Sequence, residues 1–240
     1  MKLVIITTAY NCEEWIKQCL LSIKSQKYSN FICYITNDLS TDNTVAVAEE
    51  TVGDDDRFKI INNTEKLYQT GNYDSVIRSN YSIDDDDIIV EVDGDDWLPD
   101  NDVFSRVVKY YSDHDVWITY GQFKYSDGRP GFAKWVPTNQ TRGSVFTASH
   151  LRTWKAFLWR SIKQEDLKWE GSYASAAGDI FFMLPMIEMA GEDHTLFIDD
   201  VNYVYNEGNP LNEHKGSKAA SSFFLAQHGR SLPAYSSLDR

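Results

Sequence analysis

Runs of apolar and β-branched residues alternate with segments of helical periodicity along the first half of the chain. The first run, Leu3–Thr8, is continuous, which is typical of a strand buried on both faces of a sheet. The other strands expected in this half are Phe31–Thr36, Phe58–Ile61, Asp87–Val92 and Val116–Tyr120. Strands separated by helical segments pair in parallel through right-handed crossovers. The pattern therefore predicts an α/β fold built on a mostly parallel sheet.

Amphipathic segments between these strands predict the helices. The first has one apolar stripe, formed by Trp15, Ile16, Cys19, Leu20 and Ile23. Asn11 and Glu14 have the spacing of a capping box at its start. Further helices are expected from Ser40 or Asp42 through Val47, around Gly71–Tyr81, and along the stripe Val103, Phe104, Val107, Val108 and Tyr111.

The pattern changes from about Gly121. Residues 122–143 are rich in Gly, Pro, Thr and aromatic residues and predict a long loop or hairpin, a kind of segment that often carries function. Helices are expected over Ala148–Ile162, Asp179–Met189 and Ser217–Gln227, short strands over Thr195–Ile198 and Val201–Tyr205, and a frayed tail from Arg230. We see no repeat or linker, which favours one domain over residues 1–240 with two halves, 1–120 and 121–240.

Composition excludes several classes of protein. Hydrophobic residues make up 42% of the 240, so the chain is globular rather than disordered. The formal net charge of −13 argues against a nucleic-acid partner, which needs a basic surface. The three cysteines form no C-x-x-C pair, as expected in a reducing compartment. No stretch approaches a membrane-spanning helix or a signal peptide. We expect a cytoplasmic protein and leave a peripheral membrane contact open.

An acidic turn is the main candidate for a functional site. Asp93, Asp95 and Asp96 directly follow the strand Asp87–Val92, and open α/β sheets bind ligands at this end of their strands. Carboxylates suit a hard cation such as Mg²⁺ or Mn²⁺, which could bridge the phosphates of a nucleotide-sugar. The alternative is an acidic turn that faces solvent.

Residues after the first two strands suit a nucleotide base. Thr8 and Tyr10 follow the first strand, and Asp38 follows the second, where its carboxylate could accept a hydrogen bond from a uracil N–H. A core aromatic and a turn former are the alternatives for Tyr10 and Asp38. Lys66 and Arg78 are candidates for phosphate contacts or for ordinary ion pairs.

Two segments of the second half also carry polar groups that suit a ligand. His150, Arg152 and Trp154 lie within a few residues of one another. The segment 203–214 contains Asn206, Asn209, Asn212 and His214, which either bind sugar hydroxyls and the diphosphate or belong to an ordinary loop.

Four segments together resemble family 2 glycosyltransferases. They are the opening Val4–Asn11 with Gln18–Ile23, the second-strand motif Thr36–Asp42, the D-x-D element Asp93–Asp96, and Ala177–Asp179 at the start of a helix. The resemblance spans roughly residues 3–190. It implies the GT-A fold, a doubly wound nucleotide-binding sheet with helices on both faces, fused to a C-terminal acceptor region. It also implies Asp95 as the main metal ligand, assisted by Asp93, and Asp179 as the catalytic base.

Two residues depart from the family pattern. Leu39 stands where the family usually has Gly, so this turn must avoid positive φ or absorb strain. Gly178 stands where an acidic residue usually precedes the catalytic Asp, which removes a neighbouring charge.

The sequence therefore predicts a metal-dependent, inverting glycosyltransferase that moves a sugar from a UDP-sugar to a carbohydrate or other hydroxyl acceptor. One alternative is a nucleotidyltransferase, although Ala9–Asn11 is not the basic, Gly-rich triphosphate loop which that chemistry needs. Another is a nucleotide-sugar or cation-binding module that has lost catalysis.

Overall fold

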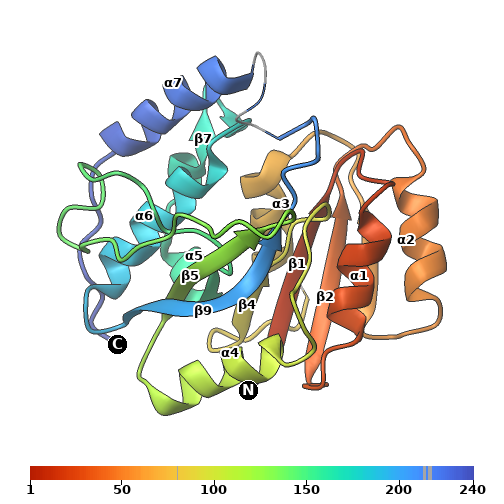
Figure 1. Ribbon diagram of the computed structural model, residues 1–240. Helices are drawn as coiled ribbons and strands as arrows, with labels where there is room; N and C mark the ends of the chain where they lie inside the picture. The colour runs from red at the N-terminus through yellow and green to blue at the C-terminus, as the bar shows by residue number, and fades with distance from the viewer. Residues whose placement is uncertain (80, 213–214, 216–217) are drawn as a thin grey trace.

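One central sheet dominates the described part of the chain, with strand order β3-β2-β1-β4-β6-β5-β9 (Figure 1). The computed structural model describes residues 1–79, 81–212, 215 and 218–240. The sheet contains β1 Leu3–Ala9, β2 Phe31–Asn37, β3 Phe58–Asn62, β4 Ile88–Glu91, β5 Ile118–Tyr125, β6 Thr153–Lys155 and β9 Thr195–Tyr205, and a separate hairpin pairs β7 Lys168–Trp169 with β8 Ser172–Tyr173. The helices are α1 Ile16–Lys24, α2 Thr44–Val52, α3 Tyr68–Ile77, α4 Val103–Asp113, α5 Ala156–Ser161, α6 Gly178–Ala190 and α7 Lys218–Ser231, with a 3₁₀ turn at Gln164–Leu167.

Most strand pairs in the sheet are parallel. β1 lies between β2 and β4, β2 pairs with β3, and β5 pairs with β9, all in parallel. β6 is antiparallel to both β4 and β5. The predicted mostly parallel α/β sheet is confirmed, and the carboxyl ends of β1, β2 and β4 meet at one edge of it.

Helices cover both faces of the sheet. Side chains alternate across a strand, so Leu3 and Ile5 pack with α1, α2 and α4, whereas Val4 and Ile6 pack with α3, α5 and α6. Figure 1 shows α1 and α2 on one side of the sheet and α6 on the other. This two-sided burial explains why β1 reads as a continuous apolar run.

Three predicted elements of the second half are wrong in detail. The helix expected over Ala148–Ile162 is a strand, β6, followed by the short helix α5. Thr153 and Trp154 favour extended structure, and β6 fills the gap between β4 and β5 where backbone partners are available. The two short strands expected between Thr195 and Tyr205 are one strand, β9, with an irregular register where it faces Gly121–Phe123 of β5. β5 continues to Tyr125, so it takes in the start of the expected loop.

The predicted helix caps and tail also differ from the structure. Asn11 does not cap α1: its Oδ1 accepts from Thr41 N at 2.8 Å, which ties the loop after β1 to the loop after β2. The N-cap of α2 is Asn43 rather than Ser40 or Asp42, although Asp42 Oδ1 accepts from Thr44 N at 3.0 Å. The predicted helix Ser217–Gln227 begins outside the described residues, and α7 continues to Ser231.

The tail from Arg230 is held rather than frayed. The Arg230 guanidinium donates to the carbonyls of Thr141, Arg142 and Ser144. Tyr235 follows, with its N–H donating to Glu188 Oε2 and its hydroxyl to Asp166 Oδ2. Among the described residues, no helix is both long enough and apolar enough to cross a membrane.

Candidate active site

A cavity of about 910 Å³ lies at the carboxyl edge of the sheet, within the size range of ligand pockets. Its wall takes residues from the ends of β1, β2 and β4, the segment before β6, the start of α6, residues 205–212 and α7. Thr8, Tyr10, Asp38, Asp93, Asp95 and Asp179, all predicted from the sequence, line this one cavity. The structure thus brings the predicted site residues together, while their individual roles stay predictions.

The acidic turn after β4 is pressed against the end of β1. Gly94 N donates to Thr8 O at 2.9 Å, and a Cβ on Gly94 would lie 2.9 Å from that same oxygen. Only glycine therefore permits this close approach. Thr8 Oγ1 also donates to Asp93 Oδ1 at 3.0 Å. The contact fixes the direction of the first carboxylate.

The other two carboxylates of the turn are joined to the end of β9 and the loop after it. Asn209 Nδ2 donates to Asp95 Oδ2 at 2.7 Å, and Asn206 N donates to Asp96 Oδ1 at 2.6 Å. Tyr203 holds the turn from β9: its hydroxyl accepts from Asp93 N at 3.1 Å and bonds the Asp96 carboxylate. Asp96 therefore anchors the loop, and Asp93 and Asp95 line the cavity with it.

Burial gives these carboxylates unusual proton affinities. Loss of solvent, reinforced by the negative charge of Glu91, raises the pKa of Asp93 to about 6. Burial also raises the pKa of Asp95, and burial with repulsion from Asp95 raises that of Asp96. A cation bound beside these carboxylates would lower their pKa values again, because it would favour their ionised forms.

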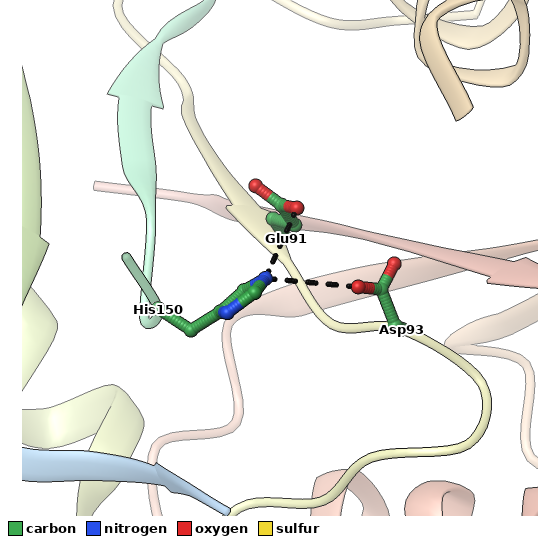
Figure 2. A group of neighbouring side chains, drawn as sticks. All are labelled: Glu91, Asp93 and His150. Atoms are coloured by element: carbon green, nitrogen blue, oxygen red, sulfur yellow. Dashed lines mark ion pairs between the residues drawn. The ribbon is translucent and has the colours of Figure 1, made fainter. Parts of the chain in front are cut away.

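Glu91, Asp93 and His150 form a cluster with the donor atoms of a metal site (Figure 2). His150 Nε2 lies 3.5 Å from Glu91 Oε1 and 3.7 Å from Asp93 Oδ2. Burial and the neighbouring Arg152 lower the pKa of His150 to about 3, so its imidazole is neutral at physiological pH.

The Glu91 side of this cluster already contains a positive charge. Arg152 Nη1 donates to Glu91 Oε1 at 2.9 Å and lies 3.2 Å from His150 Nε2. A metal ion between these two groups would be repelled by the guanidinium at contact distance. The carboxylates that fit a divalent cation are therefore those that face the cavity, Asp93 and Asp95, with Asp93 Oδ2 on the side of His150.

The predicted base-binding residues lie beside the ends of β1 and β2. Lys66 Nζ is 3.1 Å from the centre of the Tyr10 ring and also 3.1 Å from Asp38 Oδ2. The Asp38 carboxylate further accepts from Asn63 Nδ2 and from the backbone N–H groups of Leu67 and Tyr68. Asp38 thus organises residues 63–68, and a base N–H would compete with these donors for it.

Arg78, the other residue considered for phosphate, is structural. Its Nε donates to Asp74 Oδ1 at 2.6 Å, and its terminal nitrogens donate to the carbonyls of Trp159, Arg160 and Ile162. Trp154 is fully buried in the core. Of the polar groups flagged after β9, Asn206 and Asn209 reach the acidic turn, Asn212 donates to Asn206 O, and His214 lies outside the described residues.

Asp179 lies in the first turn of α6, where the helix dipole favours a negative charge. Its Oδ2 pairs with Arg152 Nη2 at 2.9 Å, and its Oδ1 accepts from Ile180 N at 2.9 Å. The side chain retains 28% exposure toward the cavity. A carboxylate that is held but accessible has the geometry of a general base.

Sequence reasoning missed Glu91, Gln69 and Tyr203 as members of the site. Glu91 offered a signal, because an acid inside an otherwise apolar strand is rarely buried without a partner. Gln69 lies on α3 and Tyr203 on β9, and nothing in their local sequence indicates that Gln69 meets Glu91 or that Tyr203 meets the acidic turn.

The chain matches the model of the family described as "Glycosyl transferase family 2" over residues 4–183. The chain belongs to this family. It is 46% identical over 56 residues to a teichoic acid poly(glycerol phosphate) polymerase of Staphylococcus epidermidis, covering 23% of this chain and 8% of the relative. It is 29% identical over 140 residues to the glycosyltransferase GlyA of Streptococcus pneumoniae, covering 53% and 18%. The chain thus spans less than a fifth of the length of either relative.

Solved structures share the fold. S. aureus TarS 1–349 in complex with UDP superposes with a TM-score of 0.66 at 15% identity, covering 96% of this chain and 64% of TarS. The mannosyltransferase PcManGT from Pyrobaculum calidifontis, in complex with GDP-Man and Mn²⁺, gives 0.59 at 18% identity, covering 88% and 58%. The expected GT-A fold is confirmed by these likenesses.

Proposed function

We propose that this glycosyl transferase family 2 chain transfers a sugar from a UDP-sugar to a hydroxyl acceptor, with a divalent cation at Asp95 and Asp93 and inversion at the anomeric carbon. The observation that carries the proposal is the single cavity in which a base site, a cluster of buried carboxylates and the accessible Asp179 lie together. TarS has been solved with UDP-GlcNAc and with UDP, which favours uridine as the base.

The concentration of negative charge in the site supports the proposal of a bound cation. Four carboxylates lie within six residues of the chain: Glu91 and Asp96 are buried, and Asp93 and Asp95 are half-buried. Desolvation raises the pKa of each. Arg152 is the positive group that the structure shows beside Glu91. A Mn²⁺ or Mg²⁺ ion held by Asp95 and Asp93 would neutralise charge on the departing diphosphate. Asp95 is the main ligand in this scheme, as the family resemblance implies, and Asp93, which also accepts from Thr8, assists it.

Asp38 would read the base. Uracil presents an N–H where cytosine presents an acceptor, so a carboxylate at this position favours UDP over CDP. Lys66 bridges Asp38 and the Tyr10 ring, and we propose that it turns toward the diphosphate when the base pairs with Asp38. Loss of a matched hydrogen bond to a charged group costs about 1–3 kcal/mol.

Asp179 would remove the acceptor proton. As the acceptor oxygen bonds to the anomeric carbon, the bond from that carbon to the diphosphate oxygen breaks and UDP leaves. The acceptor proton passes to a carboxylate oxygen of Asp179. Arg152 and Ile180 N hold that carboxylate in place, so the base need not be ordered at the moment of reaction.

A panel of UDP-, GDP- and CDP-sugars tests the proposal. Thermal unfolding with and without Mn²⁺ selects the donor, because a ligand at 100 times its dissociation constant stabilises by about 2.7 kcal/mol. UDP release is then measured as candidate glycan acceptors are added. Mn²⁺-dependent stabilisation by UDP-sugars, followed by acceptor-dependent UDP release, supports the function. Binding with no UDP release by any acceptor or by water indicates a binding module that has lost catalysis.

A further inference from the structure

Buried polar groups beside Asp179 form one hydrogen-bonded network. Arg152 is 5% exposed at its side chain and lies between two carboxylates, Glu91 at 2.9 Å and Asp179 at 2.9 Å. Its Nε also donates to Ala148 O at 3.0 Å. Because Glu91 and Ala148 O fix the guanidinium on two sides, it is a rigid support for Asp179 on the third side.

The far end of the network is Glu91, which is fully buried at the end of β4. Its Oε1 accepts from Arg152 Nη1 and from Gln69 Nε2 at 3.1 Å. Gln69 comes from α3, so three elements meet here: β4, α3 and the segment before β6. The pair Glu91–Arg152 is enclosed, whereas Asp179 is partly exposed at the cavity. Exposure of the side chains therefore increases from Glu91 through Arg152 to Asp179.

Gly178, at the start of α6, lies against the amide that holds Glu91. A Cβ at this position would lie 2.8 Å from Gln69 Oε1 and 3.3 Å from Thr70 Cγ2. An acidic side chain before Asp179 would therefore have to displace the Gln69 amide, which donates to Glu91. Gly178 leaves space for the Gln69 side chain, and Gln69 in turn donates to the buried Glu91.

We propose that Glu91 and Arg152 are positioning residues for Asp179, and that Glu91 supplies from β4 the carboxylate that the residue before Asp179 does not supply. Gln69 holds Glu91, and Gly178 makes room for Gln69. This inference rests on the proposed role of Asp179 in sugar transfer. Arg152 contacts neither sugar nor acceptor in this scheme and acts through the Asp179 carboxylate.

The first test is structural and independent of turnover. A crystal structure of Arg152→Met should show the Asp179 carboxylate displaced from its place beside residue 152. Arg142→Met is the matched control, since it breaks the Arg142–Glu188 pair, which involves the same helix α6 outside the cavity, and Asp179 should keep its place there. An unmoved Asp179 in Arg152→Met overturns the inference even if the protein is an active transferase.

The second test separates positioning from binding. With UDP-GlcNAc as probe and Mn²⁺ present, UDP release by water is measured for Arg152→Met and Arg142→Met. The inference predicts that kcat falls at least tenfold in Arg152→Met, while UDP affinity does not weaken and KM stays within threefold. Equal kcat values in the two variants, in a wild-type enzyme that releases UDP, contradict the inference. If the wild type releases no UDP from any donor or acceptor, the proposed function fails and the crystal structure still decides the positioning claim.

Placing an acid at position 178 tests whether Glu91 substitutes for it. Glu91→Gln should lower kcat at least tenfold in the wild-type background. Gln69→Ala with Gly178→Glu clears the space and places an acid next to Asp179, and in that background Glu91→Gln should cost less than threefold. Gly178→Glu alone should be the poorest variant because it meets Gln69. A loss from Glu91→Gln that is the same in both backgrounds would show that Glu91 does not substitute for the missing acid.

Discussion

Asn209 Nδ2 donates to Asp95 Oδ2 at 2.7 Å across 114 residues of sequence. The bond joins the acidic turn after β4 to the loop after β9. In the same loop, Asn206 N donates to Asp96 Oδ1, and Asn212 Nδ2 donates to Asn206 O. Residues 206–212 are therefore bonded to Asp95, which is proposed to hold the cation, and to its neighbour Asp96, so this loop and the donor diphosphate should be coupled.

Replacing Asn209 should weaken donor binding without unfolding the protein. Asn209→Ala frees Asp95 from its amide partner, and a hydrogen bond to a charged group contributes about 1.5–3 kcal/mol. UDP affinity in saturating Mn²⁺, measured by calorimetry, should fall about tenfold, equivalent to about 1.4 kcal/mol. Asn30→Ala, which removes an exposed amide that donates to Met1 O, is the control and should bind as the wild type does. Unchanged affinity in Asn209→Ala would show that the loop is not coupled to the donor.

Asp95→Asn should abolish the metal dependence of UDP binding. The amide keeps the shape of the side chain but removes the charge that attracts the cation. UDP affinity with Mn²⁺ should fall to the value measured in EDTA, while the unfolding midpoint stays close to that of the wild type. Asp54→Asn, in an exposed loop, controls for the loss of one negative charge. If Asp95→Asn retains Mn²⁺-dependent binding, Asp95 is not the main ligand.

Mn²⁺ binding should weaken in mildly acidic solution. Burial and Glu91 raise the pKa of Asp93 to about 6 in the folded protein, from an ordinary value of 3.8. Below pH 6 the cation must displace a proton from Asp93, so Mn²⁺ affinity should fall by about tenfold per pH unit between pH 6 and pH 4. The measurement uses Mn²⁺ alone, because a terminal phosphate itself titrates near pH 6. A flat profile over that range would exclude Asp93 as a ligand.

The raised pKa of Asp93 affects the stability of the metal-free protein in the opposite direction, because here acid is stabilising. A folded-state pKa above the unfolded one means that the folded protein binds more protons between pH 4 and pH 6. Asp93 therefore stabilises the fold below pH 4, and this contribution is lost as the pH rises through about 6. Adding Mn²⁺ should restore stability above pH 6.

Leu39 has a φ of +64°, in the region that favours glycine. The family's usual Gly at this turn is thus replaced by a residue that absorbs strain, of the order of 1–2 kcal/mol for a left-handed conformation. Leu39→Gly should be more stable to chemical denaturation than Leu39→Ala by about 1 kcal/mol, because both remove the same partly exposed side chain and only glycine relieves the strain. Equal stabilities of the two variants would mean that the turn is not strained.

Local sequence was sufficient to predict much of the fold and the clustering of carboxylates that follow parallel strands. Asp38 and Asp93 follow β2 and β4, and parallel strands bring their carboxyl ends to one edge, so strand prediction alone predicts their proximity. The same reasoning could not find β6, because Thr153–Lys155 is three residues long and becomes a strand through pairing with β4 and β5.

Long-range contacts explain the remaining differences. Asn11 has the sequence of a cap, yet its side chain bonds Thr41 on the neighbouring loop, because tertiary contacts outweigh a single capping bond. Glu91, Arg152 and Asp179 come from three segments up to 88 residues apart, and their meeting depends on how β6 and α6 approach β4. No local sequence pattern predicts how these elements pack together.

Asp179→Asn should separate chemistry from binding. The amide keeps the bond from Ile180 N but is a very weak base, and a positioned general base contributes about 10²–10⁴ in rate. UDP release should fall at least a hundredfold, while UDP affinity in Mn²⁺ stays within threefold of the wild type. Asp193→Asn, an exposed acid just beyond the other end of α6, should leave both quantities unchanged. Turnover within a few-fold of the wild type in Asp179→Asn would remove this residue from the mechanism. The anomer first formed, followed by proton NMR, tests the stereochemistry separately: a product that retains the donor's configuration would overturn the single in-line displacement.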